Sequence, residues 1–112
     1  MSLQPVPIQN VPGVPDYTCT AFLPKSSDYC LLIPVINEGS RILTELGRAQ
    51  KAGVDRLVDI VICDGGSTDG SMNPDTLELY GVNTLLVKTG PGKQGAQLRM
   101  GLHFALTFGL SL

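Results

Sequence analysis

The sequence contains no tryptophan, three cysteines and few aromatic residues, and neither sign of charge forms a long run. Cys19, Cys30 and Cys63 are odd in number and lack metal-ligand spacing, which argues against a disulfide framework and a zinc site. Free thiols are typical of a cytoplasmic protein. The net charge of −2, without a basic cluster, argues against a nucleic-acid partner.

The N-terminus has no apolar signal sequence, and no stretch reaches the ~18 apolar residues that a transmembrane helix requires. Any membrane association would therefore depend on sequence outside this chain. The 112 residues suffice for one domain, and 43% hydrophobic with 16% charged residues is typical of a globular fold. Residues 1–28 are rich in proline and show no periodicity, which predicts an extended leader before a domain over residues 29–112.

Apolar segments alternate with helical patterns across this domain. Strands are predicted over residues 29–36, 57–63 and 82–87, and helices over residues 40–52, 74–80 and 96–108. The β-α-β-α-β-α order predicts a three-layer α/β fold of parallel strands with helices packed on the sheet. The first strand reads as one covered on both faces.

Several residues set the expected helix boundaries and faces. Ser40 is predicted to cap the first helix through its hydroxyl, and Asn73 followed by Pro74 to start the second. In the last helix, Leu98, Leu102, Ala105 and Leu106 are spaced to form one apolar face.

Polar and glycine-rich loops follow all three predicted strands, and parallel strands bring such loops to one edge of the sheet. In the second loop, Asp64 can accept the imide or amide N–H of uracil or guanine, and glycines such as Gly66 permit close approach of a ligand. The same residues also suit a tight turn in which the Asp only caps the loop.

Residues of the other two loops have two interpretations as well. Glu38 can accept from a ribose or base, or compensate the dipole of the following helix. Lys93, just before a helix N-terminus, can meet a diphosphate, as can Arg99 more weakly, or Lys93 can be a solvated turn residue. Pro34 is expected at a strand end or break. His103 is expected to be a partly buried structural residue.

Residues 90–95 also fit the Gly-x-Gly-x-x-Gly dinucleotide pattern. The pattern follows the third strand instead of the first, and no acidic residue occurs after Glu78. A NAD-type domain therefore remains an alternative that these residues support weakly.

Taken together, the segments 33–38, 61–71 and 92–102 resemble family-2 glycosyltransferases, in particular the branch of dolichyl-phosphate mannose synthase and polyprenyl-phosphate glycosyltransferases. The resemblance covers about residues 29–108 and implies the Rossmann-like, nucleotide-binding half of a glycosyltransferase A-type fold. It implies a UDP- or GDP-sugar donor and an acceptor such as a lipid phosphate or a saccharide. It also assigns residues: Pro34, Val35 and Glu38 would line the nucleoside pocket, Asp64 would read the base beside Gly66, and Lys93 and Gly95 would border the donor.

The chain departs from this family in two respects. Gly65 follows Asp64 where the family often has a second Asp, so UDP and GDP are not distinguished. The family's Asp-x-Asp, which holds Mg²⁺ or Mn²⁺, and its catalytic base would lie beyond Leu112. We therefore expect no catalytic residue, no metal ligand and no turnover in this chain. One alternative is a non-catalytic nucleotide-binding module, which can form a dimer that covers its open sheet edge. Another is an α/β fragment without a ligand.

Overall fold

The computed structural model of the protein describes residues 4–91 and 94–111. Its five strands form one sheet in the order β1-β2-β5-β4-β3. The elements, in chain order, are β1 (Val6–Ile8), β2 (Tyr17–Ala21), β3 (Cys30–Val35), α1 (Arg41–Lys51), α2 (Val54–Leu57), β4 (Asp59–Asp64), α3 (Pro74–Leu79), β5 (Thr84–Lys88) and α4 (Gln94–Thr107).

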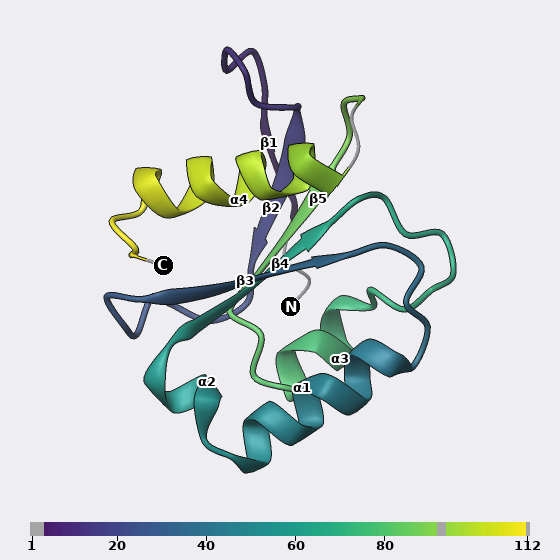
Figure 1. The fold of residues 1–112 in the computed structure, drawn as a ribbon, viewed down its shortest axis with the longest axis vertical. Helices are drawn as coiled ribbons and strands as arrows, with labels where there is room; N and C mark the ends of the chain where they lie inside the picture. Colours follow the sequence, from purple (N-terminus) through teal and green to yellow (C-terminus); the bar gives the residue numbers. More distant parts are fainter. Residues whose placement is uncertain (1–3, 92–93, 112) are drawn as a thin grey trace.

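The molecule has three layers, as the sequence predicts. Figure 1 shows α4 on one face of the sheet and α1 and α3 on the other. The interior strand β4, between β5 and β3, is buried over its whole length because helices cover both faces of the sheet there. The predicted α/β class is confirmed, and the six predicted elements all exist with boundaries shifted by a few residues.

The strands β3, β4 and β5 are parallel, and their registers bring their carboxyl ends together. Val35 pairs with Asp64, and Asp64 pairs with Val87. The loops that follow these strands therefore start from one edge of the sheet. The expectation of a wholly parallel sheet is wrong, because β2 pairs antiparallel with β5 and β1 pairs antiparallel with β2.

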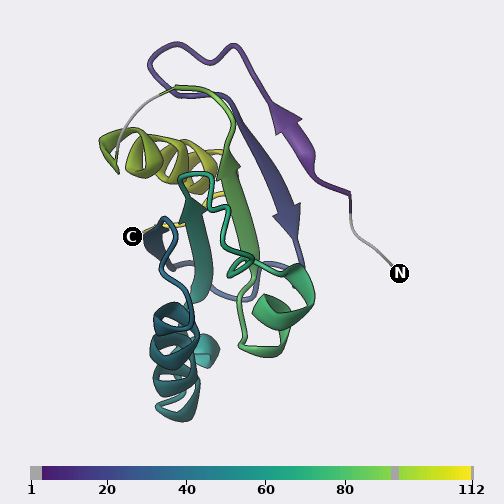
Figure 2. The same cartoon turned by 90° about the vertical axis from the view of Figure 1, so that its right-hand side faces the viewer.

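The two antiparallel strands come from the proline-rich segment over residues 1–28, which was expected to be an extended leader. Its described part, residues 4–28, adds β2 to the sheet beside β5 and β1 beside β2 (Figure 2). The surrounding prolines argue against strands in this segment, although Tyr17–Ala21 carries the aromatic and β-branched residues that strands favour. Tyr17 is 1% exposed and belongs to the core.

The first predicted strand, β3, lies at the sheet edge and is less covered than expected. Leu31 is 41% exposed. Pro34 has no backbone N–H to donate. The strand tolerates it near its end because one side of β3 is an open edge of the sheet, where no neighbouring strand needs that donor. At the start of this edge, the Cys30 N–H donates to Ser111 O at 2.7 Å.

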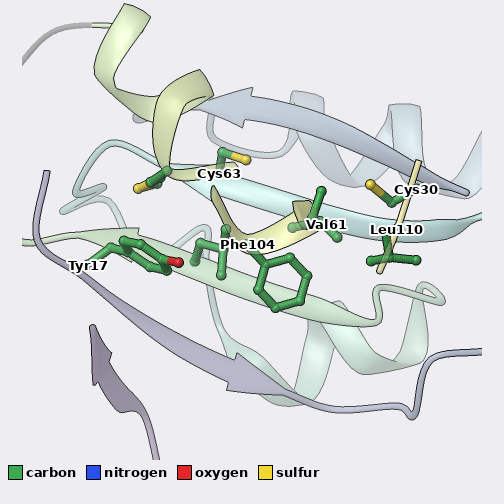
Figure 3. Close-up of a cluster of buried hydrophobic side chains, with 9 residues drawn as sticks. Tyr17, Cys30, Val61, Cys63, Phe104 and Leu110 are labelled. Carbon is green, nitrogen blue, oxygen red and sulfur yellow. The ribbon is translucent and has the colours of Figure 1, made fainter. Parts of the chain in front are cut away.

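Two hydrophobic clusters fill the spaces between the layers. One joins α1 and α3 to the sheet through residues such as Leu46 and Leu77. The other lies under α4, where Met100 and Phe104 pack against the sheet residues Val61 and Leu86 (Figure 3).

The predicted apolar face of α4 is wrong for its three leucines. Leu98 and Leu102 are each 41% exposed and Leu106 is 82% exposed, whereas Met100, Phe104 and the predicted Ala105 are buried. Large apolar residues occur on both sides of this helix, so its periodicity does not identify the buried side.

The two predicted helix caps have different outcomes. Asn73 has an extended backbone, and its side chain accepts from the N–H groups of Asp75 and Thr76, which confirms the predicted start of α3. Ser40 precedes α1 as predicted, but its hydroxyl makes no capping bond. Its backbone is already helical, with φ −76° and ψ −10°, and this conformation turns the side chain away from the helix amides.

Candidate functional site

The loops after β3 and β4 are joined by hydrogen bonds. We call them the β3 loop (residues 36–40) and the β4 loop (residues 65–73), and together they form what we call the rim. The Asn37 N–H donates to Ser67 Oγ at 2.9 Å, and Asn37 Oδ1 accepts from the Thr68 N–H at 2.8 Å. Asn37 has φ +46°, a left-handed conformation that Asn adopts more readily than most residues.

Asp64 lies at the centre of the rim, where β4 ends. Its side chain is buried, with the residue 2% exposed. It accepts from Ser67 twice, from the N–H at 3.0 Å and from the hydroxyl at 2.7 Å. These charge-assisted bonds hold the carboxylate and shape the start of the β4 loop. The loop-capping interpretation of Asp64 is therefore confirmed, and its role in reading a base stays a prediction.

A buried amide supports the rim from below. Gln97, on the second turn of α4, donates from Nε2 to Val35 O at 2.8 Å and to Cys63 O at 2.9 Å. A Cβ on Gly65 would lie 3.0 Å from Gln97 Cδ, so any side chain there would require Gln97 to shift by a few tenths of an ångström. This contact ties α4 to the ends of both β3 and β4.

The far side of the rim contains a second carboxylate link. Asp69 Oδ2 accepts from the Gly39 N–H at 3.0 Å, and Asp69 Oδ1 accepts from the Ser71 N–H at 3.0 Å. Bonds from the Ser71 hydroxyl, and then from its backbone, lower the pKa of the exposed Asp69 carboxyl from its ordinary value. The β3 and β4 loops are thus connected at two places.

A hollow of about 270 Å³ lies beside the rim, between β3 and α1. It contains three of the residues that the family resemblance assigns to a nucleoside pocket. These are Pro34, Val35 and Glu38, and the other lining residues are Ile33, Arg41, Ile42 and Glu45. Asp64 does not line this hollow, although it pairs with Val35 in the sheet.

Charge inside this hollow is largely balanced. The Glu38 carboxylate forms an ion pair with Arg41, one turn further along the chain. Glu38 therefore helps to start α1, as its structural interpretation expects, while its side chain still faces the hollow. Val35 is mainly a core residue, with 3% of its surface exposed.

The remaining predicted residues lie toward β5 and α4. Gly66 has φ +105°, and a Cβ there would lie 3.8 Å from Lys88 O, so the β4 loop passes close to the end of β5. Gly95 lies in the first turn of α4, and the nearest atom to a Cβ there would be an Arg99 guanidinium nitrogen at 3.7 Å. Packing alone does not require this glycine. Lys93 lies outside the described residues, so its predicted role stays a prediction.

Three further residues that the sequence singled out have structural contacts away from the rim. Arg99 Nε donates to Gly13 O at 3.0 Å, which connects α4 to the turn between β1 and β2. His103 is partly buried, as expected, and pairs with the Tyr17 hydroxyl at 2.7 Å. Gly90 packs against the Asp16 backbone, where a Cβ would come within 2.9 Å of the Asp16 nitrogen. This contact explains the first glycine of the dinucleotide-like pattern without a ligand.

The described residues do not fit a resident Mg²⁺ or Mn²⁺. No group of three or more His, Cys, Asp or Glu side chains within residues 4–91 and 94–111 is arranged to hold a metal ion. The carboxylates at the rim already have protein partners, since Asp64 accepts from Ser67, Asp69 from Ser71 and Gly39, and Glu38 pairs with Arg41.

Sequence reasoning missed the role of Gln97 and the specific links made by Asn37 and Ser67. Gln97 lies between apolar residues on a helix, and its polar character there was the available signal that it supports something buried. Asn37 and Ser67 lie in different loops, and each bonds to a residue about thirty positions away in the sequence. Only the parallel register of the strands brings these loops together.

Comparisons with protein-family models, curated proteins and solved structures find no significant match to this chain. Within the part of the chain that the structure describes, no helix combines the length and apolar character needed to cross a bilayer. Any functional assignment therefore depends on the geometry of the rim and on the residues that form it.

Proposed function

We propose that the rim binds the nucleoside diphosphate portion of a UDP- or GDP-sugar, in the manner implied by the resemblance to family-2 glycosyltransferases. The observation that carries this proposal is the interlocking of the β3 and β4 loops around Asp64. Asn37 and Ser67 join the loops, and a hollow containing Pro34 and Glu38 lies beside them.

The base is proposed to meet Asp64. A carboxylate has about four lone-pair sites, and Asp64 uses some of them for Ser67, most closely through Oδ1. Oδ2 also accepts from the Ser67 N–H, at 3.2 Å, and its remaining lone pair would accept an N–H from uracil or guanine. Both bases present such a donor, so this contact alone does not select between UDP and GDP.

The order of the strands supports a ligand at this edge. Three consecutive parallel strands, β3, β4 and β5, are neighbours in the sheet, and ligands of open α/β sheets bind beyond the carboxyl ends of such strands. The Rossmann-like half of a glycosyltransferase A-type fold is proposed on this basis. In that arrangement the ribose would face Glu38 and the hollow that Pro34 and Val35 line.

The diphosphate is proposed to lie toward the start of α4. This helix of 14 residues begins at Gln94, and the N–H groups of its first turn carry the positive end of the helix dipole. The glycine at position 95 leaves the backbone open to close approach, and Lys93 would supply a positive charge. We assign binding to these residues and no catalytic step.

Calorimetric titration with UDP, GDP and NAD⁺ tests the proposal. We expect UDP or GDP to bind in the absence of Mn²⁺, since no group of three or more His, Cys, Asp or Glu among the described residues is arranged to hold a metal ion, and NAD⁺ to bind more weakly. Asp64→Asn should weaken nucleotide binding at least about tenfold, the scale of one charge-assisted hydrogen bond. Asp59→Asn is the matched control, because Asp59 is equally buried at the opposite end of β4.

Two results would count against a nucleotide site at the rim. One is the absence of UDP and GDP binding to the unchanged chain. The other is an equal loss of affinity in the Asp59 and Asp64 variants, which would show that destabilisation and not direct contact reduces binding. Preferential binding of NAD⁺ would favour the dinucleotide alternative.

A further inference from the structure

A second hollow lies away from the rim, between the β1–β2 strands and the C-terminal half of α4. Its volume is about 340 Å³, within the size range of small-molecule sites. It exists because α4 contacts β3, β4 and β5 but extends less over β1 and β2. The apolar walls are formed by Val6 and Ile8 of β1, by Ala21 of β2, and by Phe104 and Phe108 at the end of α4.

A polar pair lies within this apolar lining. The Tyr17 hydroxyl and His103 Nδ1 are 2.7 Å apart, and the two rings meet edge to face. Burial raises the pKa of Tyr17 to about 12, so its hydroxyl stays neutral and can donate to Nδ1. The proton of a neutral His103 then lies on Nε2. No residue within 4–91 or 94–111 accepts a hydrogen bond from Nε2.

The charges around this hollow favour an anion over a cation. Its lining contains no Asp, Glu, Lys or Arg, and the basic side chain in it is that of His103. Tyr17 and Cys19 also face it, and burial raises the pKa of both groups, so they remain neutral there. Of the charged residues around it, Lys25 and Asp59 line an adjoining hollow beyond Ala21, and Arg99 lies one turn before His103 on α4, where its Nε donates to Gly13 O.

We propose that this hollow binds a small carboxylic acid with an apolar aryl or alkyl body, whose carboxylate pairs with His103. A benzene ring fits in a cavity of about 150 Å³, so the 340 Å³ here can hold a ring and a short chain. The apolar body would lie between β1 and the paired rings of Phe104 and Phe108, whose centroids are 4.7 Å apart. The carboxylate would accept from His103 and from the side-chain amide of Gln4, which also lines the hollow.

Titration of the full chain with 3-phenylpropanoate, 3-phenylpropan-1-ol and 3-phenylpropylamine, followed by calorimetry or ligand-observed NMR, tests this proposal. We expect the acid to bind best and the amine to bind worst.

Variants separate the charge contact from the apolar site. His103→Gln should weaken binding of the acid about tenfold, while the affinity for the alcohol changes less than about twofold. Leu102→Gln is the matched control, since Leu102 precedes His103 on α4 and does not line the hollow. Ala21→Phe should fill the hollow and abolish binding of all three probes. Val6→Trp provides a second blocking variant on an exposed edge strand if Ala21→Phe fails to fold.

Several outcomes would overturn the proposal. These are no binding of the acid to the unchanged chain, tighter binding of the amine than of the acid, and affinity for the acid that survives a folded blocking variant. An unchanged affinity in His103→Gln would also overturn it. All of these readouts are independent of nucleotide binding, since the lining of this hollow contains no residue of the rim.

Discussion

Asp59 and Asp64 occupy the two ends of β4 in the same manner. Each is 2% exposed, and each accepts the N–H and the hydroxyl of a single serine. Asp59 holds Ser26, with distances of 3.1 and 3.0 Å, and Asp64 holds Ser67, with distances of 3.0 and 2.7 Å. One strand therefore carries two equivalent buried carboxylates, of which only Asp64 lies at the proposed ligand edge.

This equivalence predicts similar losses of stability on substitution. Asp59→Asn and Asp64→Asn should each reduce the free energy of unfolding by about 1–3 kcal/mol, because the amide keeps one acceptor and leaves the other serine donor without its charged partner. Urea denaturation monitored by circular dichroism measures both values. A loss confined to one of the two variants would show that the two sites are not energetically equivalent.

The contact between Gly65 and Gln97 predicts a cost for any side chain at position 65. Gly65→Ala should destabilise the protein by about 1–3 kcal/mol, because Gln97 must move and release the two carbonyls to which it donates. Gly47→Ala is the control, since a Cβ there would make an ordinary contact of 3.4 Å with Tyr80. That helical substitution should instead stabilise by about 0.5–1 kcal/mol. Equal effects in denaturation experiments would contradict this prediction.

Alkaline pH should destabilise the fold through buried groups. Burial raises the pKa of Cys63 from 9.0 to about 12 and that of Tyr17 from 10.0 to about 12. Because the folded values are raised, the stabilisation is fully present below the unfolded values and is lost as the pH rises toward about 12. The free energy of unfolding should fall with a shallower slope above pH 9.0 in Cys63→Ala. An unchanged slope would mean that the thiol ionises equally in both states.

Acidic pH should separate the far ends of the two rim loops. The pKa of Asp69 is lowered from its ordinary value of 3.8. Its ionised form, which accepts from the Gly39 N–H, is therefore fully present above pH 3.8 and is lost only as the pH falls through the lowered pKa. The amide shift of Gly39 in NMR spectra should titrate with a midpoint below 3.8. Asp69→Asn should abolish that transition. A midpoint at or above 3.8 would refute the assignment.

The sequence predicted elements well where local pattern and packing agree. The run that ends at Asp64 is apolar and β-branched, and it forms the buried interior strand β4. Asn73 and Pro74 form a local start signal that needs no distant partner, and α3 begins there. The convergence of the β3 and β4 loops also followed, because parallel strands determine which ends meet.

The remaining features depend on distant partners that local patterns do not encode. Tyr17 lies in a proline-rich segment, and its place in the core comes from pairing with β5 some seventy residues later. The buried side of α4 could not be chosen from its sequence, since Leu106 is as apolar as Phe104. Gln97 acquires its role only because the carbonyls of Val35 and Cys63 end beneath it.

The most direct test of the central claim is an NMR titration of the isotopically labelled chain with UDP and with GDP. If the rim binds the nucleotide, the largest amide shift changes will fall on Asn37, Ser67 and other residues of the β3 and β4 loops, and the amides around Tyr17 and His103 will change little. Changes that cluster at Tyr17 and His103 instead, or no changes with either nucleotide, would contradict a nucleotide site at the rim.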